Sequence, residues 1–388
     1  MKVLVTGGAG FIGSHIVDAL VEQGASVKVI DSLHPLAHAC EPKYLNPAAE
    51  YVIGDLRDSR LVEDGVRGVE AVCHQGAMVG LGVDFDDVED YVNNNGTGTA
   101  VLLRALYRRD FSGRLVLASS MVVYGEGRYR CGVHGTLRAP PRDPQLLAAG
   151  RFDPPCPICG APLMPEAVSE EAPLDPRNVY AATKVHQEHL CFAFGRSTGA
   201  PVTALRYHNV YGPRMPRDTP YAGVASIFRS ALEGDRGPEI FEDGAQTRDF
   251  VHVEDVARAN LLALTTRPPA TGALNVASGE PHTVGEMATA LARAFGPEAP
   301  APRVTGRFRP GDVRHVFAST ALAERILGFT AGVSFEEGMA GFAAAPLRAA
   351  RADGVPIPDE VSPSGGPRPG GPRRPLHRDR AESRCSPR

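Results

Sequence analysis

Short apolar runs alternate with helical patterns from the first residue to about residue 120. Five of the runs are rich in β-branched residues and apolar on both faces, as buried parallel strands are: KVLVTG, SVKVID, EYVIGD, EAVCHQ and RLVLASS. The segments between them, such as SHIVDALVEQG, repeat apolar residues at a spacing of about 3.6, which is typical of helices that pack on one face. This alternation predicts an α/β fold built on a Rossmann-type, doubly wound parallel sheet.

Shifts in composition divide the chain into parts. We expect residues 1–210 to form the doubly wound domain, interrupted at residues 126–165 by an insertion rich in Gly, Pro and Arg, where the regular pattern lapses. Residues 211–345 are richer in loops and should form a smaller mixed α/β lobe, with a strand near 274–277 that returns to the sheet. The Pro/Gly/Arg-rich residues 346–388 cannot bury a core and are predicted to be disordered.

Charge and cysteine content restrict the classes of partner and compartment. The net charge of −4 gives no basis for nucleic-acid binding, and no apolar run approaches the roughly 20 residues of a membrane span. Met1 leads directly into an apolar strand without a basic leader, so we expect a cytoplasmic protein. Seven cysteines, an odd number in a chain of this size, argue against a disulfide framework.

A glycine-rich turn follows the first predicted strand. In VLVTGGAGFIG, Gly7 permits the tight turn, Gly10 lets a pyrophosphate approach the backbone, and Gly13 lets helix and strand pack closely. The helix N-terminus supplies positive potential for phosphates. Asp31 ends the next strand, where a carboxylate hydrogen-bonds ribose hydroxyls and repels a 2′-phosphate. The pattern predicts a dinucleotide site that prefers NAD to NADP, and Asp55, after the third strand, either contacts the adenine or caps its loop.

Tyr180 and Lys184, in YAATK, lie four residues apart and hence on one face of a predicted helix over residues 178–197. An ammonium one turn from a phenol, together with a cationic nicotinamide, is expected to stabilise the phenolate. Such a tyrosine can accept a proton from a sugar hydroxyl while hydride leaves the carbon. Ser120 ends the strand RLVLASS, at the sheet edge where doubly wound folds bind ligands, so its hydroxyl can hydrogen-bond the reacting oxygen.

Taken in order, these motifs resemble the extended short-chain dehydrogenases/reductases of the nucleotide-sugar epimerase and dehydratase group. The resemblance runs from Met1 to about Ala345, apart from the insertion, and rests on TGGAGFIG, GDLRD, NNNGTGT, ASSMVVYG, YAATK, LRYHNVYGPR, QTRDFVHVEDVA and RPGDVR. It implies Ser120, Tyr180 and Lys184 as the catalytic residues. The cofactor site that we assign on this basis consists of Gly7, Gly10, Phe11, Ile12, Gly13, Asp31, Asp55, Leu56, Tyr180 and Lys184.

The resemblance also implies a nucleotide-diphosphate sugar as substrate. The residues assigned to its binding are Asn95, Ser120, Asn209, Arg248 and Arg309. The planar guanidinium groups of the two arginines suit phosphate oxygens. The alternative for Arg248 is an ion pair with Asp249 or Asp255 at the surface.

The residues that follow Ser120 select among the reactions of the group. Family dehydratases carry an Asp-Glu pair there and decarboxylases usually a Glu, whereas this chain has Met121 and Val122, which cannot transfer protons. The remaining reaction is 4-epimerisation, in which NAD oxidises C4 transiently and the hydride returns to the opposite face. SSMVVYGEG, the Cys/His insertion and GDVRH resemble the dTDP-L-rhamnose 4-epimerases, which implies a dTDP-6-deoxy sugar. A nucleotide-sugar 4-reductase or dehydrogenase with net turnover and a UDP-hexose 4-epimerase remain alternatives.

The insertion carries two pairs of metal-binding residue types. Cys131 and His134 are separated by two residues, and so are Cys156 and Cys159. Three sulfurs and an imidazole suit tetrahedral zinc, and four protein ligands leave no open position for catalysis. We therefore predict a structural zinc that orders a loop poor in apolar residues. The alternatives are reduced surface cysteines, or His134 as an unrelated loop residue.

Two non-enzymatic interpretations compete with the enzyme. One is an NAD-sensing regulator that uses the fold without turnover, and the other is an interaction protein built around the zinc loop and the Arg-rich tail. A regulator need not retain Ser120, Tyr180 and Lys184 together with phosphate-binding arginines. We therefore expect an enzyme, and the family resemblance implies a homodimer.

Overall fold

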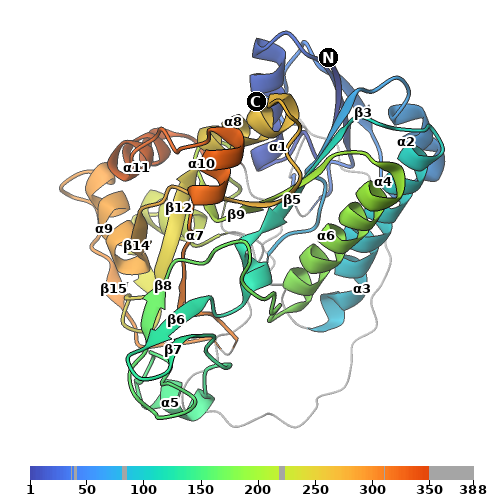
Figure 1. Cartoon of the computed structure of the whole chain (residues 1–388). Helices are drawn as coiled ribbons and strands as arrows, with labels where there is room; N and C mark the ends of the chain where they lie inside the picture. The colour runs from blue at the N-terminus through green and yellow to red at the C-terminus, as the bar shows by residue number, and fades with distance from the viewer. Residues whose placement is uncertain (36, 39–41, 81–84, 218–222, 310, 349–388) are drawn as a thin grey trace, which may run out of the picture. The chain divides into compact units, whose positions relative to one another are not determined.

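A seven-stranded parallel sheet lies at the centre of the fold, as the sequence predicts (Figure 1). The computed structural model describes residues 1–348 except 36, 39–41, 81–84, 218–222 and 310, and most of the tail predicted to be disordered lies outside these residues. The strand order is β13-β9-β5-β4-β1-β2-β3. The strands are β1 (Lys2–Thr6), β2 (Ser26–Asp31), β3 (Glu50–Ile53), β4 (Ala71–His74), β5 (Arg114–Ser120), β9 (Val202–Tyr207) and β13 (Gly272–Val276).

The direction of winding changes beside β1. From β1 the chain passes to β2 and then to β3 at the edge, and it returns to β4 on the other side of β1. Ligands of doubly wound sheets bind beyond the carboxyl ends of the strands at such a switch point. The turn after β1 and the loop after β4 are therefore the expected floor of a site.

Helices cover both faces of the sheet. On one face α1 (Phe11–Glu22), α8 (Val253–Thr265) and α10 (Ala321–Leu327) share a buried apolar cluster with the strands. On the other face, α2 (Ser59–Gly65), α4 (Gly98–Tyr107) and α6 (Val179–Thr198) do the same (Figure 1). A short helix, α3 (Val88–Tyr91), and a π-helical turn, η2 (Val92–Thr97), lead into α4.

Residues 209–348 supply the smaller lobe. Its four-stranded sheet consists of β10 (Asn209–Tyr211), β12 (Thr247–His252), β14 (Pro281–Thr283) and β16 (His315–Val316), and β11 (Glu239–Ile240) pairs with β15 (Arg303–Val304). A third apolar cluster lies among α7 (Val224–Glu233), α9 (Val284–Phe295) and α11 (Phe335–Ala344). The strand expected near 274–277 is β13, which does return to the main sheet. Because α8 and α10 pack on that sheet as well, the domain boundary near residue 210 stays a prediction.

The insertion has more regular structure than its composition suggests. β6 (Arg128–Cys131) pairs antiparallel with β7 (Gly135–Leu137) and with β8 (Met164–Glu166), and α5 (Pro144–Ala148) lies between β7 and β8 in sequence. A small apolar cluster underlies these strands: Tyr129, Cys131, Ala139, Cys156 and Leu163. Two of its five members, Cys131 and Cys156, are cysteines of the predicted metal site. So small an apolar core is expected to need a further cross-link, such as a bound metal, to hold the insertion together.

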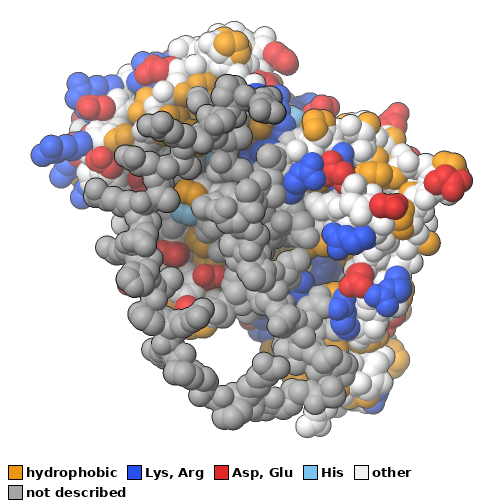
Figure 2. Space-filling model, turned by 180° about the vertical axis from the view of Figure 1, so that it is seen from behind, with side chains coloured by type: hydrophobic (Ala, Val, Ile, Leu, Met, Phe, Trp, Pro, Cys, Tyr) orange, Lys and Arg blue, Asp and Glu red, His pale blue; other side chains and the backbone are white. Residues whose placement is uncertain are grey.

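The described surface carries charges of both signs. Figure 2 shows Lys and Arg side chains lying among Asp and Glu side chains on the face opposite that of Figure 1. Exposed pairs such as Arg108–Glu63 and Arg67–Asp64 stabilise a fold by little, because water screens them. Each helix in the described part of the chain is too short or too polar to span a bilayer.

Candidate active site

The turn between β1 and α1 has the geometry of a phosphate cradle. Gly7 lies at φ +70°, in the left-handed region that favours glycine, and its N–H donates to the carbonyl of Ile30 at 2.8 Å. A Cβ at Gly13 would lie 2.1 Å from the carbonyl oxygen of Gly7, so only glycine allows this approach of helix and strand. A Cβ at Gly10 would meet only the Gly7 oxygen within 4 Å, so this side of the turn is open among the described residues. The turn therefore fits a dinucleotide pyrophosphate at the N-terminus of α1.

Asp31 stands beside this turn at the end of β2. Its carboxylate accepts hydrogen bonds from the N–H groups of Ala9 and Leu33, both at 2.9 Å. These bonds fix both oxygens at the edge of the glycine-rich turn. A carboxylate has about four acceptor positions, so two remain for ribose hydroxyls. The residue thus fits the predicted role in NAD binding.

Replacing Asp31 by Ala should weaken NAD binding by about 10- to 100-fold, because charge-assisted hydrogen bonds to the ribose are lost. NADP binding should weaken less or improve, because the repulsion of a 2′-phosphate is lost as well. Calorimetric titration with each dinucleotide measures both effects. Asp64→Ala is the matched control, since Asp64 is exposed and paired with Arg67 on α2. Equal NAD affinity in the Asp31 and Asp64 variants would remove Asp31 from the site.

The remaining residues assigned to the cofactor lie around the same turn. Phe11 and Ile12 open α1, and Phe11 packs against the ring of His15 with centroids 6.3 Å apart. Leu56 lies against Gly76 in the loop after β4. Asp55 is bound by Arg57 at 2.6 Å, and that hydrogen bond lowers the pKa of the Asp55 carboxyl. A contact of Asp55 with adenine therefore stays a prediction, beside the observed pairing within its own loop.

Ser120, Tyr180 and Lys184 come together at the carboxyl end of β5. The side chain of Asn178 caps α6 by accepting from the N–H of Ala181 at 2.8 Å, which places Tyr180 in the first turn of that helix. The Ser120 side chain is close enough to the Tyr180 phenol to act on its pKa. Lys184, one turn further, donates from Nζ to the carbonyl of Ala118 at 2.9 Å, and Nζ lies 5.8 Å from the centre of the Tyr180 ring.

Burial is the largest cause of the pKa shifts of Tyr180 and Lys184 when no cofactor is bound. It raises the pKa of Tyr180 to about 12, against the smaller opposing effect of the hydrogen bond with Ser120. It lowers the pKa of the Lys184 ammonium to about 8. Lys184 is not among the groups that shift the pKa of Tyr180 in the chain alone, so the expected stabilisation of the phenolate by Lys184 stays a prediction. A bound nicotinamide, which is positively charged when oxidised, would lower the pKa of Tyr180.

A buried polar network lies beside the residues predicted to be catalytic, and the motifs of the sequence do not identify it. Glu188 lies one turn after Lys184 on α6, accepts from the hydroxyl of Ser119 at 2.5 Å, and receives two bonds from Arg206 at 2.9 and 2.8 Å. Arg206 also donates to the hydroxyl of Tyr124 at 2.9 Å. The signal available was the spacing of Lys184 and Glu188, which puts both on one helix face.

Asn95 and Asn209 occupy different kinds of environment. Asn95 is fully buried; its amide exchanges hydrogen bonds with the backbone of Met78 at 2.7 and 3.0 Å and donates to Thr183 at 2.9 Å. It therefore fixes the loop after β4 to α6, and a direct contact with substrate stays a prediction. The Oδ1 atom of Asn209 is buried and has no hydrogen-bond partner among the described residues. Such an acceptor fits a ligand that donates a hydrogen bond there.

The two arginines assigned to phosphates lie near one segment of chain. Arg248, on β12, donates to the carbonyls of Thr247, Arg314 and Val313 at 2.9, 2.8 and 2.6 Å. Arg309 is exposed, and its guanidinium lies 4.8 Å from the ring centre of Phe241. Burial raises the pKa of the Asp312 carboxyl, and the positive charges of both arginines act against that shift. Both cations thus lie near enough to Asp312 to affect its pKa, and their contact with phosphates stays a prediction.

The four predicted metal ligands converge in the insertion. One ligand atom from each of Cys131, His134, Cys156 and Cys159 lies within 4.8 Å of the others. The sulfurs of Cys131 and Cys159 are 3.7 Å apart, and His134 Nδ1 is 3.6 Å from the sulfurs of Cys131 and Cys156. A tetrahedron with Zn–S of about 2.3 Å and Zn–N of about 2.1 Å has edges of about 3.8 and 3.6 Å. The donor set and its spacing therefore fit zinc, and 3.7 Å is too long for a disulfide.

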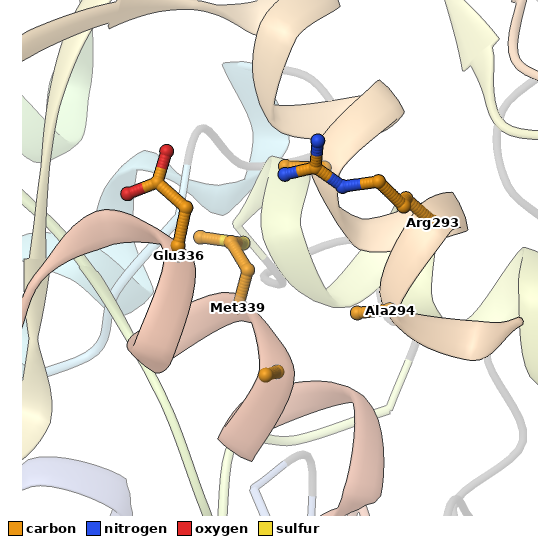
Figure 3. A pocket seen from close by; sticks show the side chains of 6 residues that line it. Arg293, Ala294, Glu336 and Met339 are labelled. Atoms are coloured by element: carbon orange, nitrogen blue, oxygen red, sulfur yellow. The ribbon is translucent and has the colours of Figure 1, made fainter.

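Two hollows lie elsewhere on the smaller lobe. One, of about 220 Å³, lies between α9 and α11, where Arg293 and Glu336 extend over Met339 (Figure 3). The other, of about 700 Å³, adjoins it beside β14 and β15. Neither is lined by a residue assigned to the cofactor, the substrate or the metal. The chemistry at the end of β5, not the volume of these hollows, therefore locates the candidate active site.

Comparison with known proteins identifies the family. The sequence profile of the NAD dependent epimerase/dehydratase family matches residues 3–145 and 156–277. The chain belongs to this family. The family resemblance read from the motifs is therefore confirmed, and the unmatched residues 146–155 fall inside the insertion.

Individual relatives of the family cover most of the chain. A dTDP-L-rhamnose 4-epimerase from Burkholderia thailandensis is 34% identical over 87% of this chain and 93% of its own length. A putative UDP-glucose 4-epimerase from Methanocaldococcus jannaschii is 32% identical, over 87% and 95%. Among solved structures, Thermus thermophilus UDP-glucose 4-epimerase in complex with NAD has a TM-score of 0.68 and 31% identity, with 88% of this chain and 98% of that chain covered.

Proposed function

We propose that the protein is an NAD-dependent nucleotide-sugar 4-epimerase. The observation that carries the proposal is the group of Ser120, Tyr180 and Lys184 at the end of β5, on the same sheet edge as the glycine-rich turn after β1. Fold and cofactor cradle alone suit many redox enzymes. A phenol beside a serine hydroxyl suits the removal and return of a proton at an alcohol oxygen.

The side chains after Ser120 favour epimerisation within the family. Met121 and Val122 lie in a 3₁₀ turn, η3 (Met121–Tyr124), and neither carries a group that can move a proton. The next acid along the chain, Glu126, is buried and accepts from the N–H of Arg314 at 3.0 Å. Dehydration and decarboxylation therefore lack a proton-transferring side chain in this part of the site.

Each catalytic side chain has one task in this scheme. Bound NAD supplies the acceptor for hydride from sugar C4 and the donor for its return. Tyr180 Oη takes the C4 hydroxyl proton as the carbon is oxidised, and it gives a proton back when the keto group is reduced. The Ser120 hydroxyl holds the reacting oxygen within reach of Tyr180. Lys184, anchored on the Ala118 carbonyl, supplies positive charge near the phenol.

We propose a dTDP-linked 6-deoxy sugar such as dTDP-L-rhamnose as the substrate. The support is the relative of that activity, at 34% identity over 87% of the chain. UDP-hexoses are the second candidate, because relatives named for UDP-glucose are 32% and 31% identical. A dehydrogenase with net turnover would differ from an epimerase in releasing NADH after each cycle, and a reductase would differ in releasing NAD.

We further propose that the insertion binds one structural zinc through Cys131, His134, Cys156 and Cys159. The fit of their separations to a tetrahedron supports this assignment. All four positions are filled by protein atoms, so the ion has no place in the hydride transfer. A homodimer, which the family resemblance implies, also remains a proposal.

Incubation of the purified protein with dTDP-L-rhamnose and, separately, with UDP-glucose tests the reaction. The expected result is a C4 epimer of dTDP-L-rhamnose without accumulation of NADH, followed by NMR and by absorbance at the reduced nicotinamide band. Faster conversion of UDP-glucose would move the proposal to the second candidate. Stoichiometric NADH formation would contradict epimerisation and support a dehydrogenase.

A further inference from the structure

The insertion contacts the lobe that carries Arg248 and Arg309, the arginines assigned to the diphosphate. The rings of Tyr129, on β6, and His315, on β16, lie 6.2 Å apart. The contact depends on Arg142, whose side chain is only 4% exposed. Arg142 donates to the carbonyl of Asp312 from Nε at 3.1 Å and from a terminal nitrogen at 2.6 Å. Its other terminal nitrogen pairs with Glu242 at 2.8 Å.

Arg314 joins the same two parts of the chain from the opposite side. Its side chain, 1% exposed, binds Asp153 of the insertion at 2.8 Å and Glu242 of the lobe at 2.9 Å. Its backbone N–H donates to Glu126, at the start of the insertion, at 3.0 Å. Glu242 thus forms ion pairs with two arginines, Arg142 of the insertion and Arg314 of the lobe. Arg142, Glu242 and Arg314 are all buried, so removing one of them leaves another buried charge unpaired, which is strongly destabilising.

The segment held by this junction is the one that Arg248 binds. Arg142 donates hydrogen bonds to the carbonyl of Asp312, and Arg248 donates to the next two carbonyls, those of Val313 and Arg314. Arg309 precedes the segment by three residues. The insertion therefore contacts the backbone that accepts hydrogen bonds from Arg248, and the N–H of Asp312 in that segment donates to the carbonyl of Arg309 at 3.2 Å.

The four clustered metal-ligand residues bracket Arg142 in the sequence, which would help to hold the loop around it in one conformation. Arg142 lies in sequence between the two ligand pairs, and it also donates to the carbonyl of Phe152 at 3.4 Å. A metal ion held by Cys131, His134, Cys156 and Cys159 would close the loop that contains Arg142, Phe152 and Asp153. Closing a loop lowers the entropy lost when its residues are ordered.

We propose that Arg142 is a positioning residue for the diphosphate of the nucleotide sugar, and that the cross-linked insertion exists to deliver it. Arg142 acts through the Asp312–Arg314 segment, since its own guanidinium nitrogens are bound to protein oxygens. The proposal rests on the proposed function of the site. It assigns substrate affinity, rather than the hydride transfer, to the insertion.

Arg142→Gln tests the proposal, with Arg151→Gln as the matched control at an exposed position of the same insertion. We expect Arg142→Gln to weaken dTDP binding, measured by calorimetry, by about tenfold or more and to raise KM for the nucleotide sugar similarly, with kcat within about threefold. The NAD affinity should be unchanged. Amide exchange in peptides that cover residues 311–316 should become faster in Arg142→Gln and not in Arg151→Gln.

Arg142→Lys keeps the positive charge beside Glu242 and guards against a variant that fails to fold. It loses the two-pronged donation to the Asp312 carbonyl, so its dTDP affinity should lie between those of the wild type and Arg142→Gln. Wild-type affinity and wild-type exchange in both Arg142 variants would overturn the proposal. A wild-type protein that turns over no nucleotide sugar would instead overturn the proposed function, and the exchange of residues 311–316 would still decide the role of Arg142.

Discussion

Tyr180→Phe is expected to lower kcat by about a thousandfold or more, within the range that positioned acid–base groups contribute. The substitution removes the phenol oxygen, on whose pKa Ser120 acts, and leaves the ring in place. Because the ring keeps its packing, NAD binding should change by less than about threefold, and thermal stability should be preserved. Steady-state kinetics and calorimetric titration with NAD measure the two effects on one preparation.

Tyr107→Phe is the control for this substitution, since Tyr107 is 64% exposed at the end of α4 and should be replaceable without effect. A Tyr180→Phe protein with wild-type turnover would show that another group moves the proton. Equal losses of kcat and of NAD affinity would point instead to a damaged cofactor site.

Cys156→Ala is expected to abolish stoichiometric metal binding, with zinc content falling from about one atom per chain to near zero. Structural zinc contributes about 10–16 kcal/mol of apparent binding free energy in small domains that fold with it. The insertion has only a small apolar cluster, to which Cys131 and Cys156 themselves belong. Without the ion its strands should open, so proteolysis should cut within residues 132–160 while the sheet domain stays intact. Elemental analysis and limited proteolysis provide the measurements.

The choice of control separates metal loss from a general effect of removing a thiol. Cys385→Ala changes a cysteine outside the described residues and outside the cluster, so zinc and protease resistance should be retained. An unchanged protease pattern in metal-free Cys156→Ala would contradict a structural role for the site. Wild-type protein purified without any zinc, yet resistant to proteolysis, would contradict the site itself.

The sheet domain could be predicted because its signals are local. Runs such as KVLVTG are short and apolar on both faces, and their alternation with helices fixes a parallel sheet. The roles of Gly7 and Gly13 follow from backbone geometry that few other residues adopt, and the structure has Gly7 at φ +70°. The cysteine spacing similarly predicted a cluster that the structure brings within 4.8 Å.

Contacts between distant parts of the chain could not be predicted in this way. Arg142 and Glu242 are 100 residues apart, and no periodicity links an arginine in a loop to a buried glutamate in another lobe. The pKa of Tyr180 depends on how much of the phenol the fold buries, which the spacing of Tyr180 and Lys184 does not reveal. The strands of the insertion are three or four residues long, too short for an alternating pattern to stand out.

The central claim is that hydride leaves sugar C4 and returns to the same carbon. Epimerisation of dTDP-L-rhamnose deuterated at C4 tests it most directly, with NMR and mass spectrometry of the product. The account predicts a C4 epimer that retains the deuterium at C4, because the label is carried on the cofactor and returned to the other face without exchange with water. Loss of the label to solvent would show that the C4 hydrogen leaves as a proton and would contradict the account.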